Sequence, residues 1–259
     1  MISVAVLGAL GNMGREVVSA VMGDPELELA GVVDAEASDA ESLPRHPVSG
    51  LAVLDDVSRL DPATVDVVVD FTVAHAAVRN ILWTLDNGVH AVVGTTGISE
   101  EDIGRLADRA ASGNANVLIA PNFAIGAVLM MRFSKMAASV FDQCEIVELH
   151  HRGKRDAPSG TAIATARLVE RAMKPSEIPS SQEREVSGTR GGKVGPINIH
   201  SIRLDGLVAH QEILFGAKGQ TLSIRHDTTD RSCFMPGVII AVKAVADLPG
   251  LTIGLDSLL

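Results

Sequence analysis

A short apolar run near the N-terminus passes directly into a turn that contains three glycines. Val4 to Leu7 has the uninterrupted apolar character of a strand that is buried on both faces. Gly8, Gly11 and Gly14 follow it, and the pattern over residues 15–22 is helical. A strand, a glycine-rich turn and a helix in this order predict the start of a β-α-β unit. Because such a unit needs a parallel sheet with covering helices, this feature limits the fold to the α/β class.

Apolar runs and helical patterns continue to alternate as far as about residue 122. The predicted strands are residues 27–33, 65–71, 89–94 and 116–120, and the predicted helices are residues 75–85 and 100–111. The polar stretch 35–50 is predicted to be a loop. We therefore expect a Rossmann-like, doubly wound parallel sheet that forms a dinucleotide-binding domain over residues 1–121.

The pattern changes in the second half of the chain. The predictions there are a helix over 124–139, strands over 145–149 and between 197 and 227, and a C-terminal helix over 234–247. Turn residues at 204–206 and 216–219 separate the β-rich runs, which favours antiparallel neighbours. We therefore expect a second, α+β domain over residues 122–226 with an open, largely antiparallel sheet.

Composition and charge argue against several classes of protein. The formal net charge of −10 disfavours a nucleic-acid binder, since such affinity comes largely from Lys and Arg. Two cysteines without C-x-x-C spacing predict neither a disulfide framework nor a zinc site, and the scattered histidines outside residues 150 and 151 predict no metal centre. No apolar run reaches the ~18 residues of a membrane span, and the N-terminus lacks a basic leader. We expect a cytoplasmic protein with no nucleic-acid or membrane partner.

The glycine-rich turn has the sequence context of a pyrophosphate site. Backbone N–H groups and the helix N-terminus can hold an anion there, and glycine lets the backbone approach it. The spacing is G-x-x-G-x-x-G rather than the commoner G-x-G-x-x-G, so a plain strand-to-helix turn is the alternative. The residues expected to bind a dinucleotide in this turn are Gly8, Ala9, Leu10, Gly11, Asn12 and Met13.

Asp34 ends the next predicted strand, at the spacing of about 20 residues after the glycines that dinucleotide folds use. A carboxylate there can accept hydrogen bonds from the adenosine ribose hydroxyls, although a solvated acid at a strand end is the alternative. The same carboxylate would repel a 2′-phosphate unless a cation lies close by, and Ala35 follows instead. The expected cofactor is NADH, NADPH or both, with NADH favoured at least as much.

Two further loops follow predicted strands. In open α/β sheets the carboxyl edge of the strands lines the ligand crevice, so small and amide-bearing loops there suit the nicotinamide half of a dinucleotide. For either loop a plain turn is the alternative. The candidate residues are Gly94, Thr95 and Thr96, and Ala120, Pro121, Asn122 and Phe123.

Positive charge and histidine gather in one segment of this acidic chain. His150 to Arg155 holds two His, two Arg and one Lys, and it precedes a predicted helix start at Ser159. Helix N–H groups would add to the positive potential, and a histidine can transfer a proton near neutral pH. An anionic substrate that must be protonated fits this segment best, and a solvated basic surface is the alternative.

Together these segments resemble one enzyme family. The chain resembles the 4-hydroxy-tetrahydrodipicolinate reductase (dihydrodipicolinate reductase) family of bacterial lysine and diaminopimelate synthesis over essentially its whole length, in residues 8–14, 94–97, 120–123 and, most specifically, 150–161. The resemblance implies an NAD(P)H-dependent reduction of 4-hydroxy-tetrahydrodipicolinate to tetrahydrodipicolinate, with loss of water.

The resemblance also implies roles for single residues. His150 would be the proton donor, and Lys154 would be a second catalytic donor that also contacts a substrate carboxylate. The small dicarboxylate substrate would be bound by His151, Lys154, Ser159, Gly160 and Thr161. Leu10 departs from many relatives, which have Gly there, and the position after Asp34 lacks the Arg of some relatives.

The same resemblance implies how the chain is organised. Residues 227–259 would return to complete the first domain. The second domain would serve both substrate binding and oligomerisation, with its antiparallel sheet at the core of a homotetramer.

Two alternatives to this function stay open. The first is another dinucleotide-dependent oxidoreductase of amino-acid metabolism, such as an amino-acid or semialdehyde dehydrogenase; a thioester mechanism would need a reactive cysteine, for which Cys144 and Cys233 are poor candidates. The second is a regulatory protein that binds NAD(H) without turnover. Such a protein would not need the histidines and cations of residues 150–154.

Overall fold

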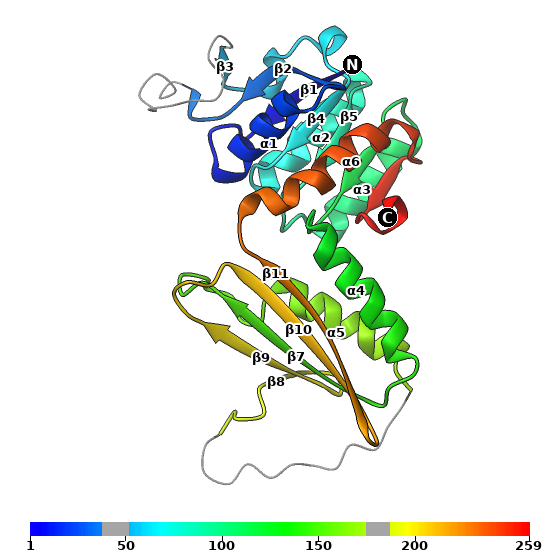
Figure 1. Ribbon diagram of the computed structural model, residues 1–259. Coiled ribbons are helices and arrows are strands. Elements are labelled where there is room, and N and C mark those ends of the chain that lie inside the picture. The colour runs from blue at the N-terminus through cyan, green and yellow to red at the C-terminus, as the bar shows by residue number, and fades with distance from the viewer. Residues whose placement is uncertain (38–51, 175–186) are drawn as a thin grey trace. The chain divides into compact units, whose positions relative to one another are not determined.

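The computed structural model describes residues 1–37, 52–174 and 187–259 (Figure 1). These residues form two compact units, one of Met1–Ile125 together with Phe234–Leu259 and the other of Gly126–Cys233. Most of the loop predicted over residues 35–50, including His46, lies outside the described residues. No helix in the described part of the chain is long and apolar enough to span a membrane.

The first unit contains a seven-stranded sheet in the order β12-β6-β5-β4-β1-β2-β3, in which every strand pair is parallel. Its strands are β1 (Ile2–Leu7), β2 (Leu27–Val33), β3 (Val53–Leu54), β4 (Val67–Asp70), β5 (His90–Val93), β6 (Val117–Ile119) and β12 (Leu251–Ile253). The predicted doubly wound parallel sheet is confirmed. The very short strands β3 and β12, which form the two edges of the sheet, were not predicted.

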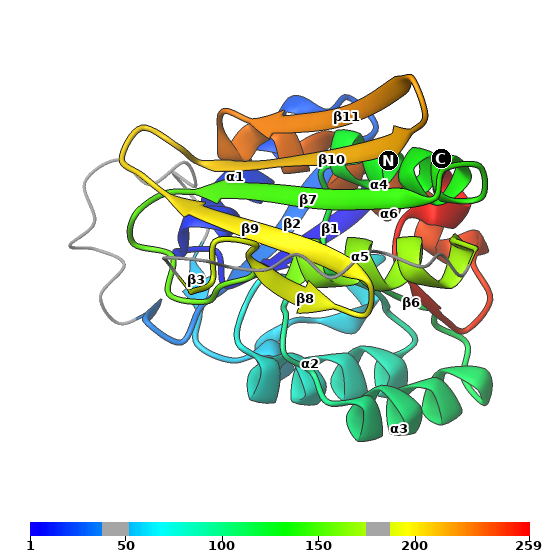
Figure 2. The same cartoon turned by 90° about the horizontal axis from the view of Figure 1, so that it is seen from below.

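Helices cover this sheet in two pairs. The helices are α1 (Asn12–Gly23), α2 (Ala74–Asn87), α3 (Glu100–Ala111) and α6 (Met235–Ala244). Helix α2 packs against α3, as Figure 2 shows, and α1 packs against α6. Local signals fix the helix ends: Ser99 caps α3 by accepting from the Asp102 N–H, and α2 ends at Gly88, which has the left-handed conformation. The helix predicted over 234–247 continues past α6 only as a 3-10 turn.

The strand order places four of the sequence-selected segments at one edge of the sheet. β1, β2, β5 and β6 are parallel, so the residues that follow them emerge at the same carboxyl edge. The chain moves outward from β1 through β2 to β3, and from β4 through β5 to β6 in the opposite direction. The reversal between β1 and β4 is the switch point at which open α/β sheets bind ligands.

The second unit contains a five-stranded sheet in the order β11-β10-β7-β9-β8. The elements are α4 (Ile125–Ala138), β7 (Gln143–His150), α5 (Gly160–Ala172), β8 (Gly192–Val194), β9 (Ile197–Arg203), β10 (Ala209–Ala217) and β11 (Gln220–Thr228). All pairs are antiparallel except β7 with β9. The predicted open, largely antiparallel sheet is confirmed.

One detail of this sheet was predicted wrongly. The turn at 204–206 does not join neighbouring strands, because β7 lies between β9 and β10. β7 is therefore the central strand, and its Ile146 is flanked by Ile199 of β9 and Ile213 of β10, all of them buried. Its central position gives the buried Ile146 an apolar neighbour on each adjacent strand. A local turn signal cannot reveal this strand order. The turn at 216–219 does form the β10–β11 hairpin.

The core of the second unit lies between the sheet and its helices. Buried Cys144 and Ile146 of β7 pack with Phe215 of β10 and with Ala166 and Val169 of α5. Because successive residues of a strand face opposite sides, Glu148 and His150 lie on the same side of β7 as these core residues. A carboxylate thus lies at the end of an apolar core face.

Candidate active site

The glycine-rich turn folds so tightly that two of its positions exclude a side chain. Gly8 has φ +75°, and a Cβ atom there would lie 2.6 Å from the carbonyl oxygen of Phe71. A Cβ atom on Gly14 would lie 2.0 Å from the carbonyl oxygen of Gly8. Glycine is therefore required for helix α1 to begin directly against the end of β1. Helix α1 begins at this turn without a side-chain cap, so its first backbone N–H groups can bind a pyrophosphate.

Asp34 is hydrogen-bonded to the same turn. Its Oδ2 accepts from the Leu10 N–H at 2.8 Å, and its Oδ1 accepts from the Glu36 N–H at 3.0 Å. Arg15 donates from Nε to the carbonyl oxygen of Leu10 at 2.9 Å. Leu10 and Ala9 are buried, so these two residues present backbone rather than side chains. Each carboxylate oxygen of Asp34 keeps a further lone pair for a hydroxyl donor.

A buried carboxylate organises the loop after β5. Asp70 accepts from the Thr95 hydroxyl at 2.8 Å and from the Asn80 side-chain amide at 2.7 Å. A Cβ atom on Gly94 would lie 2.1 Å from the Phe71 ring, so only glycine fits beside that ring. Thr95 is buried, whereas Thr96 is exposed. The structure therefore gives Thr95 a structural contact that its sequence context did not reveal.

The loop after β6 lies at the same edge. Ala120 donates its N–H to the carbonyl oxygen of Val93 at 2.9 Å, and Asn122 accepts from the Ala124 N–H at 2.9 Å. Ala120 and Phe123 are buried, and the ring of Phe123 lies 5.8 Å from that of Phe71. The sheet thus brings all the predicted dinucleotide-binding segments to one edge.

In the second unit, the residues predicted to bind substrate lie around the N-terminus of α5. Ser159 is the N-cap, and its hydroxyl accepts from the Ala162 N–H at 3.1 Å. The first N–H groups of α5, those of Gly160 and Thr161, have no acceptor among the described residues. The helix N-terminus carries partial positive charge, so these N–H groups can bind a carboxylate.

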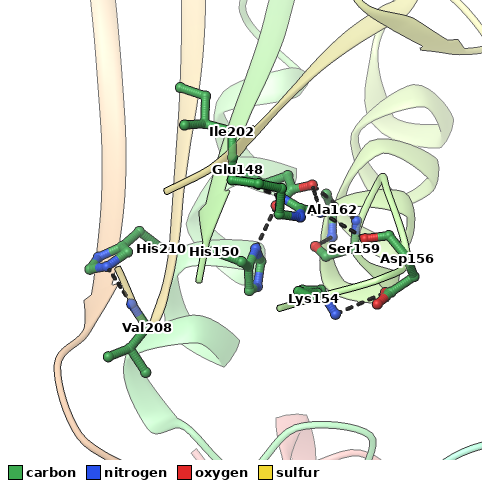
Figure 3. Close-up of polar contacts among 10 residues, drawn as sticks. Glu148, His150, Lys154, Asp156, Ser159, Ala162, Ile202, Val208 and His210 are labelled. Atoms are coloured by element: carbon green, nitrogen blue, oxygen red, sulfur yellow. Dashed lines mark hydrogen bonds and ion pairs between the residues drawn. The ribbon is translucent and has the colours of Figure 1, made fainter. Parts of the chain in front are cut away.

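Glu148 connects this helix end to His150 and Arg203. Glu148 is fully buried, and its Oε2 lies 2.5 Å from Nδ1 of His150, whose side chain is 14% exposed (Figure 3). Arg203 of β9 donates to both oxygens of Glu148, at 2.8 and 2.7 Å. The Ser159 N–H also points to Glu148, at 3.3 Å. The buried carboxylate therefore holds three elements of the site together.

The surroundings of Glu148 favour its charged form. Burial raises the pKa of this carboxyl, but hydrogen bonds from His150, Arg203 and Ser201, together with the charge of Arg203, outweigh burial and lower the pKa to about 2. Glu148 is therefore ionised throughout the neutral range. An ionised carboxylate only accepts hydrogen bonds, so Nδ1 of His150 must carry the proton between them.

Acidic side chains pair with two of the cations in the basic segment, residues 150–155, and so reduce its positive charge. The ammonium group of Lys154 lies 2.8 Å from Asp156, and Arg152 lies 4.0 Å from Asp205 in a largely exposed pair. Lys154 is partly buried, at 23% exposed, whereas His151 and Arg155 are exposed. Lys154 is thus the cation of the segment that is held beside α5 and His150 (Figure 3).

Two residues of this site were missed from the sequence. Glu148 and Arg203 each lie in a strand, where a charged residue usually faces solvent. A signal was available for Glu148, because it shares the period-two face of Cys144 and Ile146, which predicts burial. Nothing in the sequence links it to Arg203, which lies 55 residues further on.

The cysteines do not form a competing site. Burial raises the pKa of the Cys144 thiol to about 12, with a smaller contribution from Glu145, and burial also raises the pKa of Cys233. Neither thiol has the lowered pKa of a reactive nucleophile. Within the described ranges, no three His, Cys, Asp or Glu side chains group together as metal ligands would.

Comparison with known families matches the chain in two adjoining segments. The family model for the N-terminus of dihydrodipicolinate reductase matches residues 2–123, and the model for its C-terminus matches residues 126–259. The chain is 47% identical over 258 residues to the 4-hydroxy-tetrahydrodipicolinate reductase of Mycolicibacterium smegmatis, covering 99% of this chain and 98% of that one. It is 46% identical over 271 residues to the enzyme of that name from Synechocystis, covering 100% and 98%.

Solved structures give the same result. A dipicolinate-bound dihydrodipicolinate reductase from Paenisporosarcina superposes with a TM-score of 0.90 at 39% identity, over the full length of both chains. An aspartate dehydrogenase from Thermotoga maritima, at 12% identity and a TM-score of 0.54 over 94% of this chain and 96% of that one, shares the fold alone.

Proposed function

This chain belongs to the dihydrodipicolinate reductase family, and from that premise we propose how its residues carry out the reaction. The chain is an oxidoreductase of lysine and diaminopimelate biosynthesis, with 4-hydroxy-tetrahydrodipicolinate reductase activity. In that reaction the substrate loses water and gains a hydride and a proton. A site for it needs a hydride source, a dicarboxylate site and an acid.

The first unit is proposed to hold the nicotinamide dinucleotide. The glycine-rich turn fits this group, because Gly8 and Gly14 let α1 begin directly against the end of β1, and the uncapped N-terminus of α1 can hold an anion. The pyrophosphate would lie against the backbone of residues 8–13. The nicotinamide half would lie near residues 94–96 and 120–123. When bound, the reduced nicotinamide supplies the hydride.

Asp34 is proposed to accept hydrogen bonds from the adenosine ribose. Its carboxylate is fixed by the Leu10 and Glu36 N–H groups, so it is held in place before the nucleotide arrives. Arg15, a cation close to this turn that could offset a 2′-phosphate, already donates to the Leu10 carbonyl. We therefore propose that NADH serves at least as well as NADPH.

The second unit is proposed to hold the substrate. One carboxylate of a dicarboxylate would take the free N–H groups of Gly160 and Thr161, with Ser159 at the cap. Lys154 and His151 would contact a carboxylate from the loop before α5. Lys154 would exchange its partner Asp156, at least in part, for the substrate.

His150 is proposed to donate the proton. Reduction of a conjugated imine by hydride leaves an electron-rich enamine, which an acid close by can protonate. With Nδ1 directed to Glu148, the Nε2 atom of His150 is the one that can give its proton to the substrate. Lys154 is proposed as the second donor, which supplies fixed positive charge as the reaction proceeds.

We also propose that the chain forms a homotetramer. Helices α4 and α5 lie on one face of the five-stranded sheet, and no described element of the second unit covers the other face (Figure 2). Sedimentation of the purified protein tests this: a mass near four times 27.1 kDa is expected, and a monomer at micromolar concentration would refute it.

One observation carries the catalytic proposal: His150, the free N-terminus of α5 and Lys154 lie together around a buried carboxylate. The direct test supplies freshly made 4-hydroxy-tetrahydrodipicolinate and follows nicotinamide absorbance with NADH and, separately, NADPH. Substrate-dependent oxidation that dipicolinate inhibits supports the proposal. Oxidation of neither cofactor would overturn it.

A further inference from the structure

We propose that Glu148 is a positioning residue for the proton transfer: it orients the His150 ring through Nδ1 and fixes its tautomer. This inference rests on the proposed role of His150 as the proton donor. It adds an assignment that the sequence did not make, because Glu148 lies in the strand before the basic segment.

The geometry excludes a merely incidental contact. Glu148 has no exposed surface, and the 2.5 Å separation from His150 Nδ1 is that of a short, charge-assisted hydrogen bond. A buried charge costs several kcal/mol unless its partners compensate, and here every partner is a donor. Those partners are His150, Arg203, the Ser159 N–H and Ser201.

Arg203 compensates the negative charge of the buried Glu148. Its guanidinium holds both carboxylate oxygens, and its remaining hydrogen bonds go to the carbonyl oxygens of Ile202 and Asp156. The guanidinium is thus fixed from β9 and from the loop that carries Lys154. Glu148 stays charged as a result, and it can hold His150 and the start of α5 at the same time.

Within the described ranges, His150 makes a hydrogen bond or ion pair with no carboxylate other than Glu148. The charged and histidine side chains on the elements around it are Glu145 and Glu148 on β7, His200 and Arg203 on β9, His210 and Glu212 on β10, His151, Arg152, Lys154, Arg155 and Asp156 in the loop before α5, and Asp205 in the loop after β9. His210 directs its Nδ1 to Asp227 at 2.6 Å, and Asp156 pairs with Lys154. The first turn of α5 carries no acidic residue.

A consequence for the wild-type protein can be measured without any variant. Because an ionised carboxylate cannot donate, neutral His150 must keep its proton on Nδ1 and leave Nε2 bare. Nitrogen-15 NMR of histidine-labelled protein at alkaline pH distinguishes the two tautomers. The Nδ1–H tautomer of His150 is expected, and the Nε2–H tautomer would overturn the proposal.

The second experiment replaces the carboxylate. Glu148→Gln keeps the shape and removes the charge, and its side-chain amide can either donate or accept, so the preference of neutral His150 for the Nδ1–H tautomer should be lost. Glu148→Asp, which keeps the charge, should keep the tautomer closer to that of wild type. A wild-type tautomer in Glu148→Gln would refute the proposal.

Glu145→Gln is the matched control. Glu145 lies on the same strand, and it pairs with a histidine, His200, at 2.8 Å. Glu145 and Glu148 are an odd number of residues apart, so they lie on opposite faces of β7. The control variant should leave the His150 tautomer unchanged.

A double-mutant cycle separates positioning from a general loss of structure. In the wild-type background Glu148→Gln should lower kcat by about tenfold or more, with a much smaller change in KM. In a His150→Gln background the same change should lower kcat by less than about twofold, since its target is gone. Equal losses in both backgrounds would contradict the proposal. If His150→Gln alone keeps full turnover, the donor assignment fails, while the NMR results still decide whether Glu148 sets the state of the ring.

Discussion

The Lys154 ammonium group lies 2.8 Å from the Asp156 carboxylate, within the loop that joins β7 to α5. The hydrogen bond from Lys154 is also the main reason that the pKa of Asp156 falls below its usual value. Lys154 is therefore held in place by a partner that an incoming carboxylate can compete with. A cation that is positioned in advance loses less side-chain entropy when it binds an anion.

This arrangement predicts what the loss of Lys154 does. Lys154→Ala should weaken inhibition by dipicolinate by about 10- to 100-fold, the range expected for a charge-assisted hydrogen bond. Binding of NADH, measured by fluorescence titration, should change much less. Arg152→Ala is the control, because it removes the same charge from a largely exposed side chain two residues away. Equal losses for inhibitor and cofactor would place Lys154 outside the substrate site.

The tight turn at the N-terminus predicts a different effect. Gly14→Ala would force a Cβ atom to within 2.0 Å of the Gly8 carbonyl oxygen, so the turn and α1 must separate. NADH affinity should fall by about tenfold or more, while dipicolinate still protects the protein from thermal unfolding. Gly23→Ala in the same helix has no atom within 4 Å of the new Cβ and should bind NADH as wild type does. Unchanged affinity in Gly14→Ala would remove the turn from the cofactor site.

The proposed role of Asp34 predicts that this residue influences cofactor choice. Asp34→Asn removes the charge that opposes a 2′-phosphate and weakens the acceptor for the ribose hydroxyls. The ratio of kcat/KM for NADPH to that for NADH should rise by about tenfold. Asp86→Asn, which removes a carboxylate paired with Arg109 on the surface, should keep the wild-type ratio. A wild-type enzyme with a strong NADPH preference would contradict our assignment of Asp34.

The lowered pKa of Glu148 predicts how the free energy of unfolding depends on pH. Its pKa is lowered from 4.5 to about 2 in the folded protein, so the folded state releases this proton more readily than the unfolded chain. The resulting stability is present above about pH 4.5 and is lost as the pH falls toward 2. At about 1.4 kcal/mol per unit it amounts to roughly 3 kcal/mol. The stability gap between wild type and Glu148→Gln, from urea unfolding, should therefore narrow between pH 5 and pH 3. If the difference in unfolding free energy between the two proteins did not change with pH, this prediction would be wrong.

The sequence predicted the first unit well because its signals are local. Runs such as Val4 to Leu7 must be buried on both faces, and Gly14 is dictated by a contact within the turn itself, with the Gly8 carbonyl oxygen. Gly8, by contrast, lies against Phe71, which is distant in the sequence. The strands β3 and β12 escaped prediction because two or three residues carry no periodicity. Their pairing with β2 and β6 depends on the sheet that is already there.

The second unit was harder to predict because its order depends on distant pairing. Placing β7 between β9 and β10 brings Arg203 beside Glu148, and no turn signal encodes that arrangement. The basic segment was predicted to be a site, yet its negative partners were not predicted. The network that holds His150 consists of residues from two strands and a helix cap, which meet only in the folded chain.

Proton donation by His150 is the central claim, and one comparison tests it most directly. Wild type and His150→Gln are assayed side by side with freshly made 4-hydroxy-tetrahydrodipicolinate at saturating NADH, with NADH affinity measured separately. We predict that His150→Gln binds NADH almost as tightly as wild type, while kcat falls by about 10²- to 10⁴-fold. A variant that turns over at the wild-type rate would contradict the account.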